Sequence, residues 1–252
     1  MSSVFLDYAT YYDLLYRDKD YLNEVEILDD LLKEYIGDNN NILEFGTGTG
    51  KHASLLSKRG YNLTGVELSN QMISLIKDPL IKNKTYQGDI RTFKIESKFN
   101  AILSLFHVIS YMVENSDLDQ VFQNANNHLN KEGIFIFDVW HLPAVLHHGV
   151  ETRIKRVKEN DIELLRLTEA KLNKEKNTCL VNFSIYLLDT LKKTYENIFE
   201  SHNMRYFTPD EISNHGEKNG FKIVQTIGFP SKKEPDRNTW GVLYVLKKIE
   251  NI

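Results

Sequence analysis

The sequence predicts a Rossmann-like α/β fold, with a seven-stranded, mostly parallel sheet, helices on both faces and an inserted antiparallel β meander. The first observation behind this prediction is that short apolar runs alternate with stretches of helical periodicity, which is typical of a parallel sheet covered on both faces. The second is that residues 151–207 switch to long alternating stretches separated by polar turns, a pattern that favours antiparallel strands. The chain has 252 residues, which suits one domain with an elaboration.

Four segments are expected along this single domain. Residues 1–37 form a helical cap, 38–150 the ligand-binding core, 151–207 the meander, and 208–252 a last helix and a β hairpin of the core. The strands expected in the core sheet are residues 41–45, 61–66, 84–87, 99–105, 133–139, 221–227 and 239–247. The helices expected beside them are residues 8–36, 51–59, 70–76, 118–129 and 209–220, the last with a capping box of Thr208 and Glu211.

Composition excludes several classes of protein. A net charge of −4 with interspersed charges leaves no broad basic surface, so we expect no nucleic-acid partner. No apolar run approaches the length of a membrane span, and no signal peptide is visible, so we expect a cytoplasmic protein without a membrane partner. The single cysteine, Cys179, is expected to be a packing residue. We expect no metal site, because the tandem His147-His148, placed in a surface loop, has no cluster of further ligands beside it.

A glycine-rich turn, Glu44-Phe45-Gly46-Thr47-Gly48-Thr49-Gly50, follows the first expected strand. Glycines in such a turn let the backbone approach a ligand, and the helix that follows offers unpaired N–H groups. A dinucleotide fingerprint requires Gly-x-Gly-x-x-Gly, but here the third glycine falls one position early and Lys51 stands in its place. A P-loop would require glycine at Phe45 and a hydroxyl residue at His52. Both alternatives therefore fail on spacing.

Acidic residues follow the next two expected strands. Glu67 ends the second strand, where a carboxylate can accept hydrogen bonds from both hydroxyls of a ribose. Asp89 follows the third strand, where its carboxylate can accept from an adenine amino group while Ile90 covers the ring. The alternative is that Glu67 and Asp89 only cap the helices after them. With the glycine turn, the two acids favour an adenosine-containing ligand.

The turn Glu-x-Gly-x-Gly-x-Gly resembles motif I of class I S-adenosylmethionine-dependent methyltransferases, in which the acid and the glycines hold the amino-acid end of the cofactor. Beyond the turn, the chain is similar to bacterial nucleotide-sugar N-methyltransferases, which convert dTDP-3-amino-3,6-dideoxyhexoses to dimethylamino sugars. The similar segments are Tyr12-Asp13-Leu14, Gly65-Val66-Glu67-Leu68-Ser69, Gln87-Gly88-Asp89-Ile90-Arg91 and Glu200-Ser201-His202. The resemblance implies S-adenosylmethionine as cofactor, S-adenosylhomocysteine as product, and a meander that forms part of the acceptor site and a homodimer contact. The cofactor-binding residues that it implies are Tyr12, Glu44, Gly46, Thr47, Gly48, Gly50, Glu67, Leu68, Met72, Asp89, Ile90 and Leu105.

The sequence departs from that family at two positions. Tyr111 stands where the family carries a histidine after the fourth strand. Trp240 stands where the family places an arginine suited to the substrate's pyrophosphate, and Arg237 is the nearest substitute. Trp140, His202 and Arg205 are further candidates for the acceptor pocket.

His107 and Tyr111 are the candidate catalytic residues. His107 follows the fourth strand, and ligands of open α/β sheets bind outside the carboxyl ends of the strands. A histidine there suits either proton acceptance or positioning of the acceptor, although histidines at strand ends also serve structural roles.

Three functions remain open from the sequence. The leading hypothesis is methylation of the amino group of a small, nucleotide-linked amino sugar. The second is O-methylation of a sugar or other small hydroxyl compound, which would make His107 essential, because a hydroxyl needs a base far more than an amine does. The third, a non-catalytic S-adenosylmethionine-binding module, is disfavoured by the complete set of cofactor residues.

Overall fold

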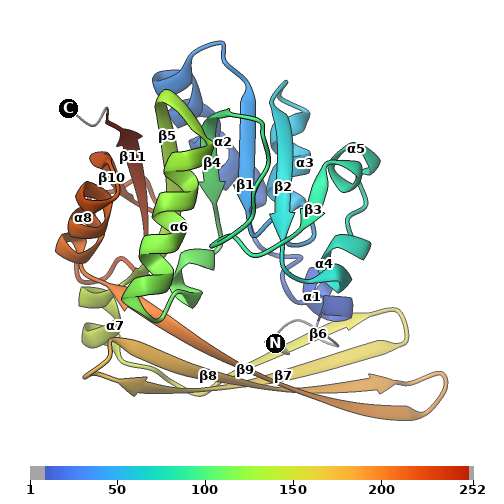
Figure 1. The fold of residues 1–252 in the computed structure, drawn as a ribbon. Helices are drawn as coiled ribbons and strands as arrows, with labels where there is room; N and C mark the ends of the chain where they lie inside the picture. Colours follow the sequence, from blue (N-terminus) through green and yellow to red (C-terminus); the bar gives the residue numbers. More distant parts are fainter. Residues whose placement is uncertain (1–8, 250–252) are drawn as a thin grey trace.

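The computed structural model describes residues 9–249. Within that range, eleven strands form one continuous sheet with helices on both faces of its core, and the meander extends beyond the core as a long curved ribbon (Figure 1). The strands are β1 (Asn41–Phe45), β2 (Asn62–Glu67), β3 (Thr85–Gln87), β4 (Phe99–Ser104), β5 (Leu129–His141), β6 (Arg153–Glu159), β7 (Ile162–Asn173), β8 (Thr178–Asp189), β9 (Thr194–Phe207), β10 (Phe221–Gly228) and β11 (Gly241–Lys248). The helices are α1 (Ala9–Leu15), α2 (Tyr21–Ile36), α3 (Lys51–Ser57), α4 (Asn70–Ser74), α5 (Pro79–Asn83), the 3-10 helix η1 (Val108–Tyr111), α6 (Asn115–His128), α7 (Leu142–His148) and α8 (Pro209–Lys218).

The predicted fold class is confirmed. Strands β3, β2, β1, β4, β5, β11 and β10 lie side by side in this order, and β11 alone among them runs opposite to the other six. The four strands β6 to β9 form the expected antiparallel meander, so the whole sheet is larger than the seven-stranded core. Two parallel residue pairs, Trp140 with Tyr206 and His141 with Phe207, join β9 to β5 and so connect the meander to the core.

Apolar side chains of the core strands point alternately to the two faces, and each face has its own helical cover. Leu43 and Phe135 belong to the cluster that packs against α6 and α8. Ile42 and Ile136, one position away, belong to the cluster that packs against α2 and α3. Burial on both faces explains why these strands read as continuous apolar runs instead of alternating ones.

Several helix boundaries differ from the sequence expectation. The helix expected over residues 8–36 is two helices, because Asp20 caps α2 by accepting a hydrogen bond from the backbone N–H of Asn23; residue 8 lies outside the described range. Pro79 does not end a helix but begins α5, where a proline fits the first position. His147 and His148 lie in the last turn of α7, not in a loop. The capping box at Thr208 is present as predicted.

Helix α1 lies between the core and the meander. Its residue Leu15 is fully buried against Val157, Leu164, Ile185 and Leu187 on the inner face of the meander. Helix α1 thereby packs against the inner face of the meander, beside the core (Figure 1). Within residues 9–249, none of the helices combines the length and the apolar character that crossing a membrane requires.

Candidate active site

The turn between β1 and α3 is built by three glycines with left-handed backbones. Gly46, Gly48 and Gly50 have φ angles of 73°, 58° and 73°, which side chains other than glycine rarely adopt. A Cβ atom on Gly46 would lie 2.6 Å from Val108 in η1, so the turn and η1 are in close contact. A Cβ atom on Gly48 would meet nothing within 4 Å, and Gly48 lines a cavity. This part of the turn therefore presents bare backbone to a ligand.

Two acidic side chains flank the turn. Glu67 accepts hydrogen bonds from the backbone N–H groups of Gly48 (2.9 Å) and Ser69 (2.8 Å), which fixes its carboxylate at the end of β2. Glu44 is buried, and among the described residues its Oε2 atom has no hydrogen-bond partner. Burial, together with the charge of Glu67, raises the pKa of Glu44 to about 8. A buried carboxyl group that lines the cavity and has one oxygen without a hydrogen-bond partner fits a cationic group such as the α-amino group of S-adenosylmethionine.

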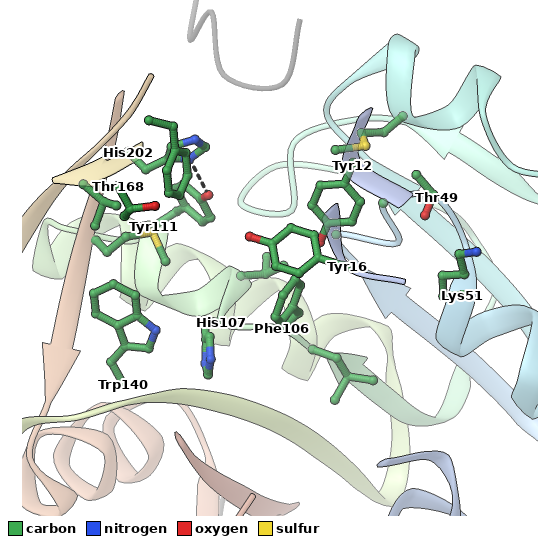
Figure 2. A pocket seen from close by; sticks show the side chains of 18 of the residues that line it. Tyr12, Tyr16, Thr49, Lys51, Phe106, His107, Tyr111, Trp140, Thr168 and His202 are labelled. Atoms are coloured by element: carbon green, nitrogen blue, oxygen red, sulfur yellow. Dashed lines mark hydrogen bonds between the residues drawn. The ribbon is translucent and has the colours of Figure 1, made fainter. Parts of the chain in front are cut away.

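One cavity of about 400 Å³ extends from the glycine turn to the inner face of the meander. Figure 2 shows Tyr12, Thr49 and Lys51 on one side of it and Tyr111, Trp140 and His202 on the other. The predicted site residues that line it are Tyr12, Glu44, Gly46, Thr47, Gly48, Glu67, Met72, Leu105, His107, Tyr111, Trp140, His202 and Trp240. Donor-site and acceptor-site candidates thus share one space.

Other predicted cofactor residues do not line this cavity. Gly50 is the N-cap of α3, Leu68 is 56% exposed, and Ile90 is buried in the core. The carboxylate of Asp89 accepts hydrogen bonds from Arg91, at 2.6 Å from Nη2, and these bonds hold the pKa of Asp89 below its usual range. The sequence predicts that Asp89 lies at the end of β3. It does not show that the guanidinium of Arg91 donates to the carboxylate of Asp89.

The two predicted arginines also lie outside the cavity lining. Arg205 donates to Glu211 (2.9 Å) and Asn115 (2.8 Å), and its ion pair with Glu211 ties the end of β9 to α8. In the structure it joins β9 to α8 and does not line the cavity, so its expected role in the acceptor pocket stays a prediction. Arg237 is exposed in the connection between β10 and β11 and does not line the cavity.

A buried acid holds the candidate catalytic histidine. Nδ1 of His107 lies 2.7 Å from Oδ2 of Asp138, and the backbone N–H of His107 donates to the same carboxylate. Burial alone would raise the pKa of Asp138, but the charge and hydrogen bonds of His107 outweigh it and hold this pKa below its usual range. Phe106 and His107 both have left-handed backbones, with φ of 64° and 63°. Such conformations cost roughly 1–3 kcal/mol each in a residue with a side chain, and they cluster at functional sites.

Aromatic residues of the N-terminal segment form one wall of the cavity. The rings of Tyr12 and Tyr16 have centroids 4.7 Å apart, and Tyr16 meets Phe106 edge-on at 5.0 Å. The segment is held to the glycine turn by Asp13, which accepts from the hydroxyl of Thr49 at 2.8 Å and pairs with Lys51 at 3.0 Å. Tyr12 is predicted at this place, but no sequence pattern indicates that Tyr16 and Phe106 join it.

A polar cluster joins η1 to β9 of the meander, and the sequence did not predict it as a unit. The hydroxyl of Tyr111 lies 2.7 Å from Nδ1 of His202, and Nε2 of His202 lies 3.1 Å from the carboxylate of Glu200 (Figure 2 shows the first of these contacts). Further along the inner face, Arg166 and Thr168 of β7 and Arg153 of β6 line the same cavity. The alternation of side chains along antiparallel strands predicts that these residues share one face of the meander. It does not predict that this face lies opposite the glycine turn.

Comparison with known proteins gives a family. Residues 16–226 match the family described as methyltransferase domain. A dTDP-3-amino-3,4,6-trideoxy-α-D-glucopyranose N,N-dimethyltransferase of Streptomyces venezuelae is 30% identical over 146 residues, which are 57% of this chain and 62% of that protein. A dTDP-3-amino-3,6-dideoxy-α-D-glucopyranose N,N-dimethyltransferase of Streptomyces fradiae is 23% identical over 225 residues, 88% of this chain and 87% of that one.

A solved structure shows the same fold. The S-adenosylmethionine-dependent methyltransferase from Clostridium acetobutylicum superimposes with a TM-score of 0.80 at 20% identity, over 96% of this chain and 97% of that one. The match to the family covers most of the chain, and the glycine turn with its buried acid fits S-adenosylmethionine. The chain therefore belongs to the methyltransferase family.

Proposed function

We propose that this enzyme transfers a methyl group to the amino group of a nucleotide-linked amino sugar. The observation that carries the proposal is the single cavity, in which the glycine turn and the inner face of the meander border the same space. The two Streptomyces relatives, named for N,N-dimethylation of dTDP-amino sugars, support the choice of acceptor.

At the donor end, the chain's own groups fit each part of the cofactor. Glu44 would bind the α-amino group, Glu67 has lone pairs left for ribose hydroxyls, and the bare backbone of Gly48 allows close approach. Tyr12 lies in the cavity wall, where an aromatic face favours a nearby cation. When bound, the cofactor supplies a methyl carbon on a sulfonium, which is already activated for transfer.

At the acceptor end, the cavity is lined by both apolar and basic side chains. Trp140 and Trp240 meet edge-to-face with centroids 5.6 Å apart and offer apolar surface to a deoxy sugar or a base. Arg153 and Arg166 supply positive charge on the meander, which suits the diphosphate of a nucleotide sugar. We assign to these two arginines the binding of the substrate's pyrophosphate, for which the sequence suggested Arg237.

His107 and Tyr111 line the cavity, where we expect them to border the acceptor. Because Asp138 fixes the ring of His107, this histidine is suited to orient the amine so that its lone pair faces the methyl carbon. Alignment of this kind accounts for a large part of catalysis in reactions with a good leaving group.

The acceptor is tested directly with labelled S-adenosylmethionine and a panel of dTDP-amino sugars, the corresponding dTDP-hydroxy sugars and the free amino sugars. We expect label in the dTDP-amino sugars, with a KM at least about 10-fold lower than for the free amino sugars, because a charge-assisted contact contributes more than about 1.4 kcal/mol. Label only in the hydroxy sugars would replace this proposal with O-methylation. Equal KM values for nucleotide-linked and free amino sugars would mean that Arg153 and Arg166 do not bind the diphosphate.

Cofactor binding is expected to depend on pH through Glu44. In the free protein Glu44 is protonated below its pKa of about 8, whereas beside an ammonium group it must be ionised. Binding of S-adenosylhomocysteine therefore releases a proton below pH 8, and its affinity should rise about 10-fold per pH unit from pH 6 to 7 and level off near 8. Titration calorimetry in two buffers of different ionisation enthalpy measures the proton release. Glu44→Gln should bind more weakly and lose this pH dependence; a wild-type affinity that is flat with pH would refute the assignment.

We further propose that the chain is one cytoplasmic domain that forms a homodimer through the meander. The outward side chains Leu188, Tyr195 and Phe199 of β8 and β9 are 41%, 62% and 69% exposed, and such apolar surface favours association.

A further inference from the structure

Lys19 is a charged residue with a largely enclosed side chain, in the turn that connects α1 to α2. Its neighbours Asp18 and Asp20 are exposed, whereas the side chain of Lys19 is 14% exposed. The ammonium of Lys19 forms an ion pair with Glu24, a buried residue in the first turn of α2. The same carboxylate lies 2.7 Å from Nε2 of His52 in α3. A charge in such surroundings needs a partner, because the protein interior solvates it poorly, and Glu24 is that partner.

The ammonium of Lys19 also lies over two aromatic rings of the cavity wall. It is 4.5 Å from the ring centroid of Tyr21 and 4.8 Å from that of Phe106, and both distances suit a cation–π contact. Such a contact is stronger when water has little access to the cation. Tyr21 and Phe106 line the cavity, whereas Lys19 does not, so Lys19 supports this wall from outside the cavity.

Phe106 is the residue before His107, and both have left-handed backbones, with φ of 64° and 63°. Conformations of this kind persist only where the contacts around them leave no alternative. Asp138 holds the second residue of the pair, because it accepts from the backbone N–H of His107 at 3.2 Å and pairs with its ring. Burial raises the pKa of Asp138, but the charge of His107 and, more weakly, that of Lys19 lower it. Lys19 therefore interacts with the ring of Phe106 and with the acid that holds His107.

We propose that Lys19 is a positioning residue for methyl transfer: anchored to Glu24, its ammonium holds the ring of Phe106 and thereby keeps His107 directed at the acceptor. The inference rests on the proposed function, in which His107 orients the amine. Lys19 acts through these side chains and is assigned no contact with the cofactor or the acceptor, because it does not line the cavity. The turn between α1 and α2 thus has a part in catalysis, although its run of charged residues is typical of a solvated turn.

The kinetic test uses steady-state assays with S-adenosylmethionine and a dTDP-amino sugar. Lys19→Met keeps an unbranched side chain but removes the charge, so kcat should fall about 10-fold, which corresponds to about 1.4 kcal/mol. KM and the affinity for S-adenosylhomocysteine should stay within about 2-fold of wild type, because Lys19 is not assigned to binding. Lys19→Arg keeps a cation for the two rings and should retain at least about half of the wild-type kcat. In the His107→Asn background, Lys19→Met should cause no further loss, since it acts through His107.

The matched control is Lys33→Met. Lys33 also pairs with a buried carboxylate of α2, that of Asp29 at 3.0 Å, but its side chain is 68% exposed and lies outside the cavity lining. This variant should leave kcat unchanged. Lys19→Gln, a second uncharged substitution, should match Lys19→Met, so that the result does not depend on one variant folding well. A Lys19→Met enzyme as fast as the control, or losses that multiply in the double variant with His107→Asn, would overturn the inference.

Hydrogen exchange tests the positioning role without an acceptor. The backbone N–H of His107 donates to Asp138, so its exchange in the S-adenosylhomocysteine complex, followed by NMR well below the unfolding temperature, measures how firmly this segment is held. Lys19→Met should speed the exchange about 10-fold, and Lys33→Met should leave it at the wild-type rate. Unchanged exchange in Lys19→Met would overturn the positioning role whatever the acceptor is. Faster exchange in a protein whose wild type methylates no amino sugar would overturn the proposed function and keep the positioning role of Lys19.

Discussion

Replacing Gly48 with valine is expected to weaken the binding of S-adenosylhomocysteine by about 100-fold or more, which corresponds to roughly 2.7 kcal/mol. Two effects act in the same direction. The backbone of Gly48 is left-handed, with φ of 58°, a conformation that a β-branched residue resists. The added side chain would also enter the space that the turn leaves open to the ligand, and it would disturb the N–H that Gly48 donates to Glu67.

A second glycine separates these effects from general loss of stability. Gly60 also has a left-handed backbone, with φ of 98°, and a Cβ there meets nothing within 4 Å, but it lies in the exposed turn after α3 and outside the cavity lining. Gly60→Val should therefore lower the melting temperature and leave calorimetric affinity unchanged. Equal affinity in wild type and Gly48→Val would mean that the cofactor does not approach this turn.

The parts of the site that the sequence predicted are those encoded by local backbone requirements. The spacing of Gly46, Gly48 and Gly50 is a local requirement of a tight turn, and the capping box at Thr208 lies within four residues. Alternation of strands and helices then brings the ends of β1, β2 and β4 to one edge, because parallel strands share their direction. The donor end of the cavity follows from these rules alone.

The parts that the sequence did not predict depend on which side chains meet across the fold. Asp89 looked available for a ligand, but Arg91 folds back onto it. Arg205 looked equally available, but the turn from β9 into α8 places Glu211 beside it. The left-handed pair Phe106 and His107 carries no sequence signal, because glycine or asparagine usually marks such positions. Each of these outcomes was decided by a partner that sequence periodicity does not specify.

The pair of His107 and Asp138 is expected to give the second large effect, this time on kcat. His107→Asn should lower kcat about 100-fold, because small losses of alignment at the reacting atoms cost about that much. Asparagine is chosen since it tolerates the left-handed backbone at φ of 63° better than most residues. Asp138→Asn should cost a similar factor, because the ring of His107 would lose the charged partner 2.7 Å away, and the affinity for S-adenosylhomocysteine should not change.

The chain offers a matched control for this pair. His215 and Asp119 are also 2.7 Å apart, but they join α8 to α6 outside the cavity lining. His215→Asn should lower the melting temperature without lowering kcat, whereas His107→Asn should lower kcat at temperatures well below unfolding. Because His107 and Asp138 act on the same nitrogen through one ring, their double variant should lose no more activity than the slower single variant. A higher KM with an unchanged kcat in His107→Asn would assign this histidine to acceptor binding. The alignment of the lone pair would then depend on other residues.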